Sequence, residues 1–410
     1  QQHCESLTTV CPSVRPSARK HSSNVMAVSD WKFFYGPSGF SIGTEFTSQI
    51  LSASMFYGRT KYLDDYGAGT LTITINNSAN FASNFAFNTG IILKTDRTGV
   101  FPLPNDPQNT YFVQEITFAD YPGNVGLSTA TLLCVDALGR AGRVQATNLS
   151  LTQQTTGLQA TAFNSLSGGP LPSTVKIQNL QTQSTASAQT YTGTVLNQLN
   201  ILNATERGIF KTKRDSDAGR ISFHGRKQVD AVTAVSFGRT TSASVIGYQQ
   251  FSRIQNGLSF INTATILPNG LANQTVSNAG SVSTYGATFY SSSTVDFDTT
   301  QAQGNAGWIA NTFSDPTDIR FEISFTDRAQ NDTAYDLFMI HRDLILFNLS
   351  YRLPTDVADT TELVALEGYS VNMTPEQTNW VLYLSPATYY QFFTLDSTTL
   401  GILDTSRLGW

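Results

Sequence analysis

The side chains best suited to chemistry are few, and their spacing matches no catalytic motif. The chain has four histidines, and it contains no H-E-x-x-H, C-x-x-C, G-x-S-x-G, P-loop or dinucleotide-binding motif. His341 lies in an apolar segment, where a core histidine is more common than a ligand or a base. The acidic pairs Asp64–Asp65 and Asp315/Asp318 have the oxygen ligands that Ca²⁺ prefers, but they stand where turn-forming Asp is expected. We therefore expect no enzyme activity, no catalytic residue, no metal site and no cofactor.

Positive charge is concentrated in two parts of the chain. Residues 207–227 hold seven of the 25 basic residues and are opposed only by Asp215 and Asp217. Residues 1–29 form a second basic segment, which we expect to be an irregular arm. A solvated loop explains either cluster alone, but two clusters favour contact with phosphate backbones through charge, without sequence preference. The predicted nucleic-acid-binding residues are Arg15, Arg19, Lys20, Arg207, Lys211, Lys213, Arg214, Arg220, Arg226 and Lys227.

The composition indicates an ordered chain with a neutral polar surface. Charged residues make up 13%, about half the usual quarter, while the apolar content of 40% argues against disorder. Such a surface favours association, because Ser, Thr, Asn and Gln can be buried between subunits without desolvating ions. Secreted β-proteins often share this composition, so that alternative stays open. The three cysteines, with Cys134 left over if Cys4 pairs with Cys11, argue against a disulfide scaffold.

Strand-like alternation dominates the chain from Trp31 onward. In residues 69–77, Leu71, Ile73 and Ile75 alternate with Thr, which is typical of a strand with one buried face. Further strands are predicted at 110–120, 129–137, 143–151, 173–180, 191–199, 228–238, 318–327 and 335–353. This density of strands predicts an all-β sandwich or barrel. A helix is expected only at 45–58, where apolar residues recur at helical spacing. No apolar run of 18 residues occurs, so we expect no membrane span.

Two neighbouring segments resemble paired strands of viral coat proteins. The first is "GGPLPSTVKIQNLQ", and the second is "TYTGTVLNQLN", in which Gly193 and Val195 occupy the x-x-G-x-V position. The pair is similar to the shell domains of nodavirus and tombusvirus coats, and to related coats of small single-stranded DNA viruses of algae and diatoms. The N-terminal arm is less basic than in those families. Asn203–Ala204 and Asn305–Ala306 lie too early for the nodavirus self-cleavage, so that activity is not carried over.

The resemblance implies an all-β fold, an eight-stranded antiparallel jelly-roll shell domain with an inserted β-rich projection and a C-terminal extension. The expected parts are a basic arm (1–29), a jelly-roll shell domain (30–239 and 318–354), a projection (240–317) and an extension that packs on the shell or a neighbour (355–410). A long, partly ordered loop is the alternative for 240–317, which is rich in Ser, Thr, Gly and Asn.

These features lead to three functional hypotheses. The first is a capsid protein of the virion that assembles with copies of itself into an icosahedral shell of the T=3 kind. It would package a single-stranded genome on its inner face, with an unknown receptor and no membrane. The second is a secreted or surface β-sandwich binding module, such as an adhesin, lectin or receptor-binding protein. The third is a carbohydrate-active enzyme, which needs two carboxylates facing each other at roughly 5 to 10 Å.

Overall fold

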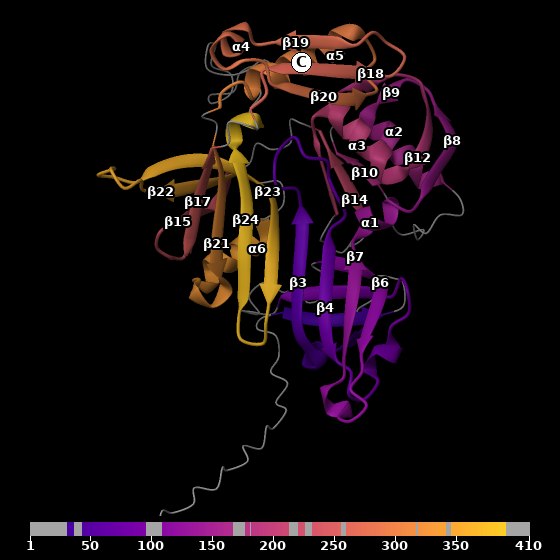
Figure 1. Cartoon of the computed structure of the whole chain (residues 1–410), viewed down its shortest axis with the longest axis vertical. Coiled ribbons are helices and arrows are strands. Elements are labelled where there is room, and N and C mark those ends of the chain that lie inside the picture. The colour runs from indigo at the N-terminus through magenta and orange to yellow at the C-terminus, as the bar shows by residue number, and fades with distance from the viewer. Residues whose placement is uncertain are drawn as a thin grey trace, which may run out of the picture.

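The computed structural model describes residues 31–36, 43–95, 109–166, 177–180, 182–212, 220–225, 232–255, 260–316, 319–341 and 346–390. Figure 1 shows two lobes of β-strands side by side, with a layer of short strands and helices above them.

Fourteen strands form one sheet that runs through both lobes. They are β1 (Trp31–Gly36), β2 (Thr44–Glu45), β3 (Ile50–Gly58), β4 (Thr70–Asn76), β5 (Gly90–Thr95), β6 (Asn109–Ala119), β7 (Thr129–Val135), β15 (Val232–Gly238), β16 (Val245–Gly247), β17 (Gln250–Gln255), β21 (Ile319–Thr326), β22 (Leu346–Tyr351), β23 (Thr360–Met373) and β24 (Thr378–Pro386). The path is β16-β15-β22-β23-β3-β4-β7-β6-β5-β1-β2, and a branch leads from β23 through β24 and β21 to β17. In Figure 1, one lobe contains β3, β4, β6 and β7, and the other contains β15, β17, β21, β22, β23 and β24. Strand β15 pairs in parallel with β16 and β22, and the other pairs are antiparallel.

Alternating apolar residues of this sheet build its core. In β4, Leu71, Ile73 and Ile75 are fully buried and the threonines between them are half-buried, as the alternation predicts. Helix α6 (Asp332–His341) packs its Phe338 against the same core, which also contains Trp380 of β24. Five 3-10 turns border the strands: η1 (Thr47–Gln49), η2 (Phe81–Asn84), η3 (Val125–Leu127), η6 (Asp327–Ala329) and η7 (Ala387–Tyr389).

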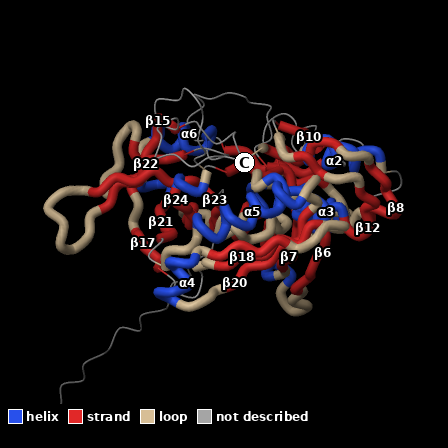
Figure 2. The backbone as a smooth tube through the Cα atoms, turned by 90° about the horizontal axis from the view of Figure 1, so that it is seen from above, coloured by secondary structure: helices blue, strands red, loops and turns tan. Residues whose placement is uncertain are grey.

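The upper layer has a second core and four small sheets. Its helices are α1 (Ala137–Ala141), α2 (Thr156–Ala162), α3 (Val195–Glu206), α4 (Ala279–Tyr285) and α5 (Thr299–Thr312), with the 3-10 turn η4 (Phe163–Ser165). Its strands are β8 (Gln145–Leu151), β9 (Gln154–Thr155), β10 (Ile177–Leu180), β11 (Thr185–Ala186), β12 (Gln189–Thr194), β13 (Ile209–Thr212), β14 (Ile221–His224), β18 (Thr263–Pro268), β19 (Gln274–Ser277) and β20 (Phe289–Thr294). Figure 2 looks down on this layer, across which α2, α3 and α5 are spread.

Most predicted strands are confirmed, but three segments differ. The predicted helix at 45–58 is largely strand β3, because Ala53, Met55 and Tyr57 face the core while the residues between them face outward. The predicted strand at 191–199 ends at Thr194, whose hydroxyl accepts from Asn197 N and caps α3. The predicted strand or strand pair at 335–353 is helix α6 followed by strand β22.

The fold is mostly β-strand with large sheets, as predicted, but the eight-stranded jelly roll is not confirmed. The main sheet has 14 strands and continues without interruption from one lobe into the other. Strands β16 and β17 of the predicted projection pair within this sheet, and β18, β19 and β20 lie in the upper layer. The four predicted domain boundaries stay predictions.

Candidate functional site

Strand β23 joins the two lobes, because its neighbour changes along its length. Residues 360–365 pair with β22, residues 368–373 pair with β3, and β24 lies along the other edge. The change occurs at Glu367, where a β-bulge interrupts the pairing between β23 and β24. A bulge adds one residue to a strand and redirects its side chain. Glu367 is consequently buried at the point where both lobes and the upper layer meet.

Two glycines allow β3 and β23 to meet closely at this point. Gly58 pairs directly with Gly368, and Gly58 has a φ of +84°, which side chains rarely adopt. A Cβ atom on Gly58 would lie 2.4 Å from the Glu367 carbonyl oxygen, and one on Gly368 would lie 2.5 Å from that of Tyr57. The backbones are therefore in contact here, and neither position has room for a side chain.

A buried ion pair fixes this junction. Arg59 Nε donates to Glu367 Oε2 at 2.8 Å, and the two side chains are only 3% and 0% exposed. Tyr390 accepts from Arg59 Nη2 at 3.1 Å and donates to Glu367 Oε1 at 2.7 Å. The Arg59 guanidinium also lies over the rings of Tyr62 and Tyr66, at 4.7 and 4.5 Å. We name Gly58, Arg59, Glu367, Gly368 and Tyr390 the lobe junction.

The protonation states at the lobe junction follow from its burial and charges. Burial opposes the charge on Arg59, but the coulombic interactions with Tyr66 and Glu367 outweigh it and raise the pKa of Arg59 well above its usual value. Burial, and then the charge of Glu367, raise the pKa of Tyr390 well above its usual value. Arg59 is thus a cation and Tyr390 a neutral donor. Loss of either charged partner would leave the other charge buried and unpaired, so the two residues depend on each other for this packing arrangement.

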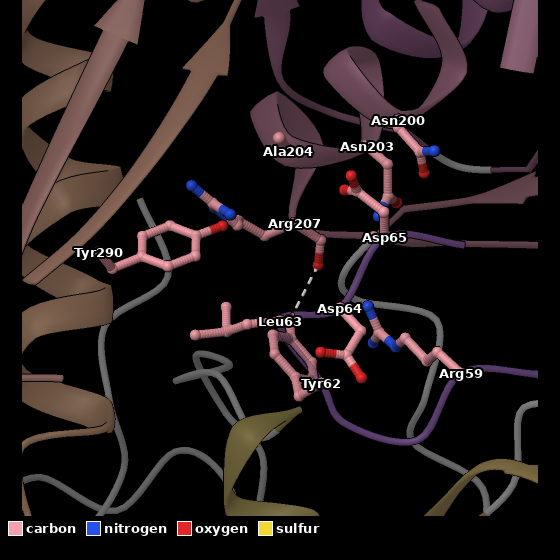
Figure 3. A pocket seen from close by; sticks show the side chains of 11 residues that line it. Arg59, Tyr62, Leu63, Asp64, Asp65, Asn200, Asn203, Ala204, Arg207 and Tyr290 are labelled. Carbon is pink, nitrogen blue, oxygen red and sulfur yellow. Dashed lines mark hydrogen bonds between the residues drawn. The ribbon is translucent and has the colours of Figure 1, made fainter. Parts of the chain in front are cut away.

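A small pocket lies beside the lobe junction. It is lined by Arg59, Tyr62, Leu63, Asp64, Asp65, Asn200, Asn203, Ala204, Arg207, Gly208 and Tyr290 (Figure 3). Its interior volume is about 20 Å³, which is room for about one water molecule. Asp64 and Asp65 are exposed at its edge, and Thr60 donates to Asp64. Ligand pockets are usually several hundred Å³, so this pocket does not fit a substrate.

Arg207, one of the predicted nucleic-acid-binding residues, is buried in this pocket. It ends α3 in the left-handed conformation, with a φ of 54°, and its carbonyl accepts from the Tyr62 hydroxyl at 3.1 Å. In Figure 3 its side chain extends toward Tyr290. Nearby Asp296 is also buried; burial raises the pKa of Asp296, while the Thr294 hydroxyl and the charge of Arg207 lower it. Arg207 therefore serves the interior rather than an open surface.

The other predicted basic residues divide into two groups. Lys211 is buried in β13, and Arg220 is half-buried just before β14. The remaining seven lie outside the described residues: Arg15, Arg19, Lys20, Lys213, Arg214, Arg226 and Lys227. Within the described part of the chain, no cluster of three or more His, Cys, Asp or Glu side chains could hold a metal. No helix there is long and apolar enough to cross a membrane.

Two further buried carboxylates, Asp136 and Glu206, are not identified by the sequence analysis. Asp136 caps α1, accepting from Gly139 N at 3.0 Å and from the Thr212 hydroxyl at 2.8 Å, so it ties β7 to β13. Burial raises its pKa to about 6. Glu206 accepts from the Thr156 hydroxyl and from Ser184 N, both at 2.8 Å. Asp136 comes directly after a strand and three residues before the amide that it caps, which is the one local signal that identifies it.

Comparison with known proteins assigns the fold. No family model matches the sequence, and no curated protein matches it. The structure is similar to a tail protein from Neisseria meningitidis MC58, with a TM-score of 0.59, 11% identity and coverage of 86% of this chain and 95% of that one. It is also similar to the 43 kDa tail protein of prophage MuSo2 from Shewanella oneidensis, with a TM-score of 0.55, 10% identity and coverage of 87% and 97%. The chain therefore has the fold of these phage-type tail proteins.

This finding corrects the capsid hypothesis. The resemblance to nodavirus and tombusvirus coats is wrong, because it depends on two short segments, while the similarity in fold to the tail proteins covers 86% and 87% of the chain. The second of those segments is also half helix. The icosahedral T=3 shell of identical copies and the packaged single-stranded genome are withdrawn with it. The alternative of a secreted or surface binding module gains no support from these neighbours.

Proposed function

We propose that the protein is a structural, non-enzymatic component of a phage-type tail, within the particle but outside its capsid. The observation that carries this proposal is the extent of the similarity, which covers 86% and 87% of this chain and 95% and 97% of the two tail proteins. A shared accessory domain would align only in part. Agreement in fold over most of both chains at about 10% identity indicates that selection has preserved the shape of the protein more than its sequence.

The outer face of the main sheet supports this proposal. Across β23, β3, β4 and β7, the outward row consists of Asn372, Ser54, Thr72 and Leu133, which are directly paired. The next row includes Ser52, Thr74 and Thr131. These residues carry no charge, and the first row crosses from β23 to β3, where the two lobes meet. A protein surface can pack on such a face without the cost of removing ions from water.

The described pocket and the buried charges support a non-enzymatic role. The pocket beside the lobe junction has room for about one water. Arg59, Glu367 and Tyr390 complete one another's hydrogen bonds. An enzyme site instead needs polar groups directed at an open space large enough for a substrate. These buried polar groups connect the lobes and the upper layer to one another.

The test is to locate the protein in particles made by the cells that produce it. We expect gold-labelled antibody to mark tails and not heads, and deletion of the gene to leave heads without complete tails. Labelling of heads, or complete tails in the deletion strain, would overturn the proposal. Hydrolytic activity of the purified protein on cell-wall glycan or peptide would overturn its non-enzymatic part.

A further inference from the structure

The hairpin between β6 and β7 lies at the lower end of its lobe (Figure 1). It exposes large apolar side chains. Val125 and Leu127 are 66% and 58% exposed, and Phe118 and Tyr121 are about half exposed. We name these four residues the apolar tip. None of the four belongs to the buried core, to which this hairpin contributes Ala130, Leu132 and Cys134 of β7. Clustered exposed apolar residues mark interaction surfaces in soluble proteins.

The apolar tip stands on a backbone that is held in place. Asn124 N donates to Tyr121 O, and Leu127 N donates to Asn124 O, both at 2.9 Å. The buried Ser128 hydroxyl accepts from Tyr121 N at 3.2 Å. A preorganised surface loses little conformational entropy on binding. The tip is therefore built as a docking surface rather than a loose loop.

The edge of β6 next to the apolar tip points to a polypeptide partner. Strand β5 pairs with residues 109–112 of β6, and within the described residues 115–119 pair only with β7. The other edge of 115–119 therefore presents backbone donors and acceptors next to the apolar side chains. An added strand satisfies such an edge, whereas a lipid surface does not.

The charges beside the apolar tip indicate which residues should surround the contact surface of that partner. Residues 109–130 contain no Lys or Arg, and their two acids, Glu115 and Asp120, are both exposed beside the tip. These acids would repel an anionic membrane surface, and they would attract Lys or Arg. We propose that the apolar tip docks on another protein of the tail, through an apolar face bordered by basic residues. This inference depends on the proposed function.

The test measures access to the tip in the assembled particle. Val125→Cys is placed in a Cys4→Ser/Cys11→Ser background, where Cys134 is buried. The control is Val357→Cys, at a loop position that is 97% exposed. In the free protein we expect a maleimide to label both introduced thiols at similar rates. In purified particles we expect labelling at position 125 to slow at least tenfold, and labelling at position 357 to stay fast.

Each outcome has a separate meaning. Absence of the chain from the particle would contradict the proposed function. Presence of the chain with unslowed labelling at position 125 would overturn the docking inference alone. A photo-crosslinker attached at position 125 should join a different tail protein; crosslinking to a second copy of this chain would overturn it. Binding of the free protein to phosphatidylcholine vesicles that is lost in Val125→Ser would overturn it in favour of a lipid.

A second variant tests the charge. Glu115→Lys/Asp120→Lys leaves the apolar residues in place and changes the charge beside them from negative to positive. We expect this variant to fold normally but to lose at least tenfold of its incorporation into particles. Glu115→Gln/Asp120→Asn, which removes the charge without reversing it, should have an intermediate effect. Equal incorporation of the parent and the two double variants would overturn the inference that basic residues surround the partner's contact surface.

Discussion

The lobe junction and the apolar tip are built on the same sheet, and both depart from the usual rule that charged side chains face water and apolar side chains are buried. They depart from it in opposite ways. At the junction, the charged Arg59 and Glu367 are inside the molecule and contact each other. At the tip, Val125 and Leu127 are apolar and exposed, with no partner among the described residues that covers them. The junction is complete within one chain, while the tip is complete only when something else covers it.

This difference separates residues that hold the fold from residues that await a partner. Changes at the lobe junction should lower the free energy of unfolding, because they disturb contacts within the chain. Changes at the apolar tip should leave that free energy nearly unchanged, because the tip has few such contacts. Stability measurements can therefore test the comparison without any knowledge of the partner.

The largest effect is expected at the buried ion pair. Glu367→Gln or Arg59→Met leaves one charge buried without its partner, and should lower the free energy of unfolding by about 3–5 kcal/mol. Arg352→Met is the control, because its pair with Asp359 is 42% exposed on both sides and should cost below about 1 kcal/mol. Urea denaturation measures each variant. The double variant Arg59→Met/Glu367→Gln should cost less than the sum of the single changes, and strict additivity would count against a coupled pair.

The next largest effect is expected at the crossing of β3 and β23. Gly58→Ala places a methyl group 2.4 Å from a carbonyl oxygen at a φ of +84°, and should cost about 3 kcal/mol from overpacking and backbone strain. Gly67→Ala is the matched control, because a Cβ there meets nothing within 4 Å. Equal denaturation midpoints for the two variants would show that the lobes can separate at this point.

A smaller effect is expected from Asp136, which should make the free energy of unfolding depend on pH. The pKa of Asp136 is about 6 in the folded protein, against an ordinary value of 3.8, so the folded state holds this proton more tightly than the unfolded chain. Its contribution to stability is present below about pH 4 and is lost as pH rises through 6, with a size of at most about 3 kcal/mol. Asp136→Asn should remove this part of the pH dependence. If the stability of Asp136→Asn varied with pH as that of the parent does, Asp136 would be excluded as the source of the pH dependence.

Local pattern explains which parts of the fold were predictable. The alternation of Leu71, Ile73 and Ile75 identifies β4, because a strand with one buried face repeats every two residues. Strand β3 was missed because the bulge after Ile50 shifts its register and leaves Leu51 exposed, which mimics helical spacing. Strand propensity alone predicts a strand through 191–199, but the Thr194 hydroxyl caps a helix that begins at Val195.

The lobe junction could not be predicted, because its partners are remote in the sequence. Arg59 and Glu367 are 308 residues apart, and neither lies in a motif. The basic cluster at 207–227 predicts a charged surface, yet Arg207 and Lys211 are buried. The charge on a side chain does not report its burial when the fold supplies counter-charges from elsewhere, as Asp296 does for Arg207.

The smallest effect on stability is expected at the apolar tip. The buried face of the same β6–β7 hairpin supplies a control substitution. Val125→Ser/Leu127→Ser should change the free energy of unfolding by no more than about 0.5 kcal/mol, because both side chains already face water. Leu132→Ala, on the buried face of the same hairpin, should cost about 2–5 kcal/mol.

Urea denaturation of the three proteins measures this contrast. If the tip variant were destabilised as much as Leu132→Ala, the tip would belong to the fold, and the distinction from the lobe junction would fail. If it is as stable as the parent but is excluded from particles, its apolar residues act only in contact with a partner. In that case the free protein exposes them because their contacts form on assembly, not on folding.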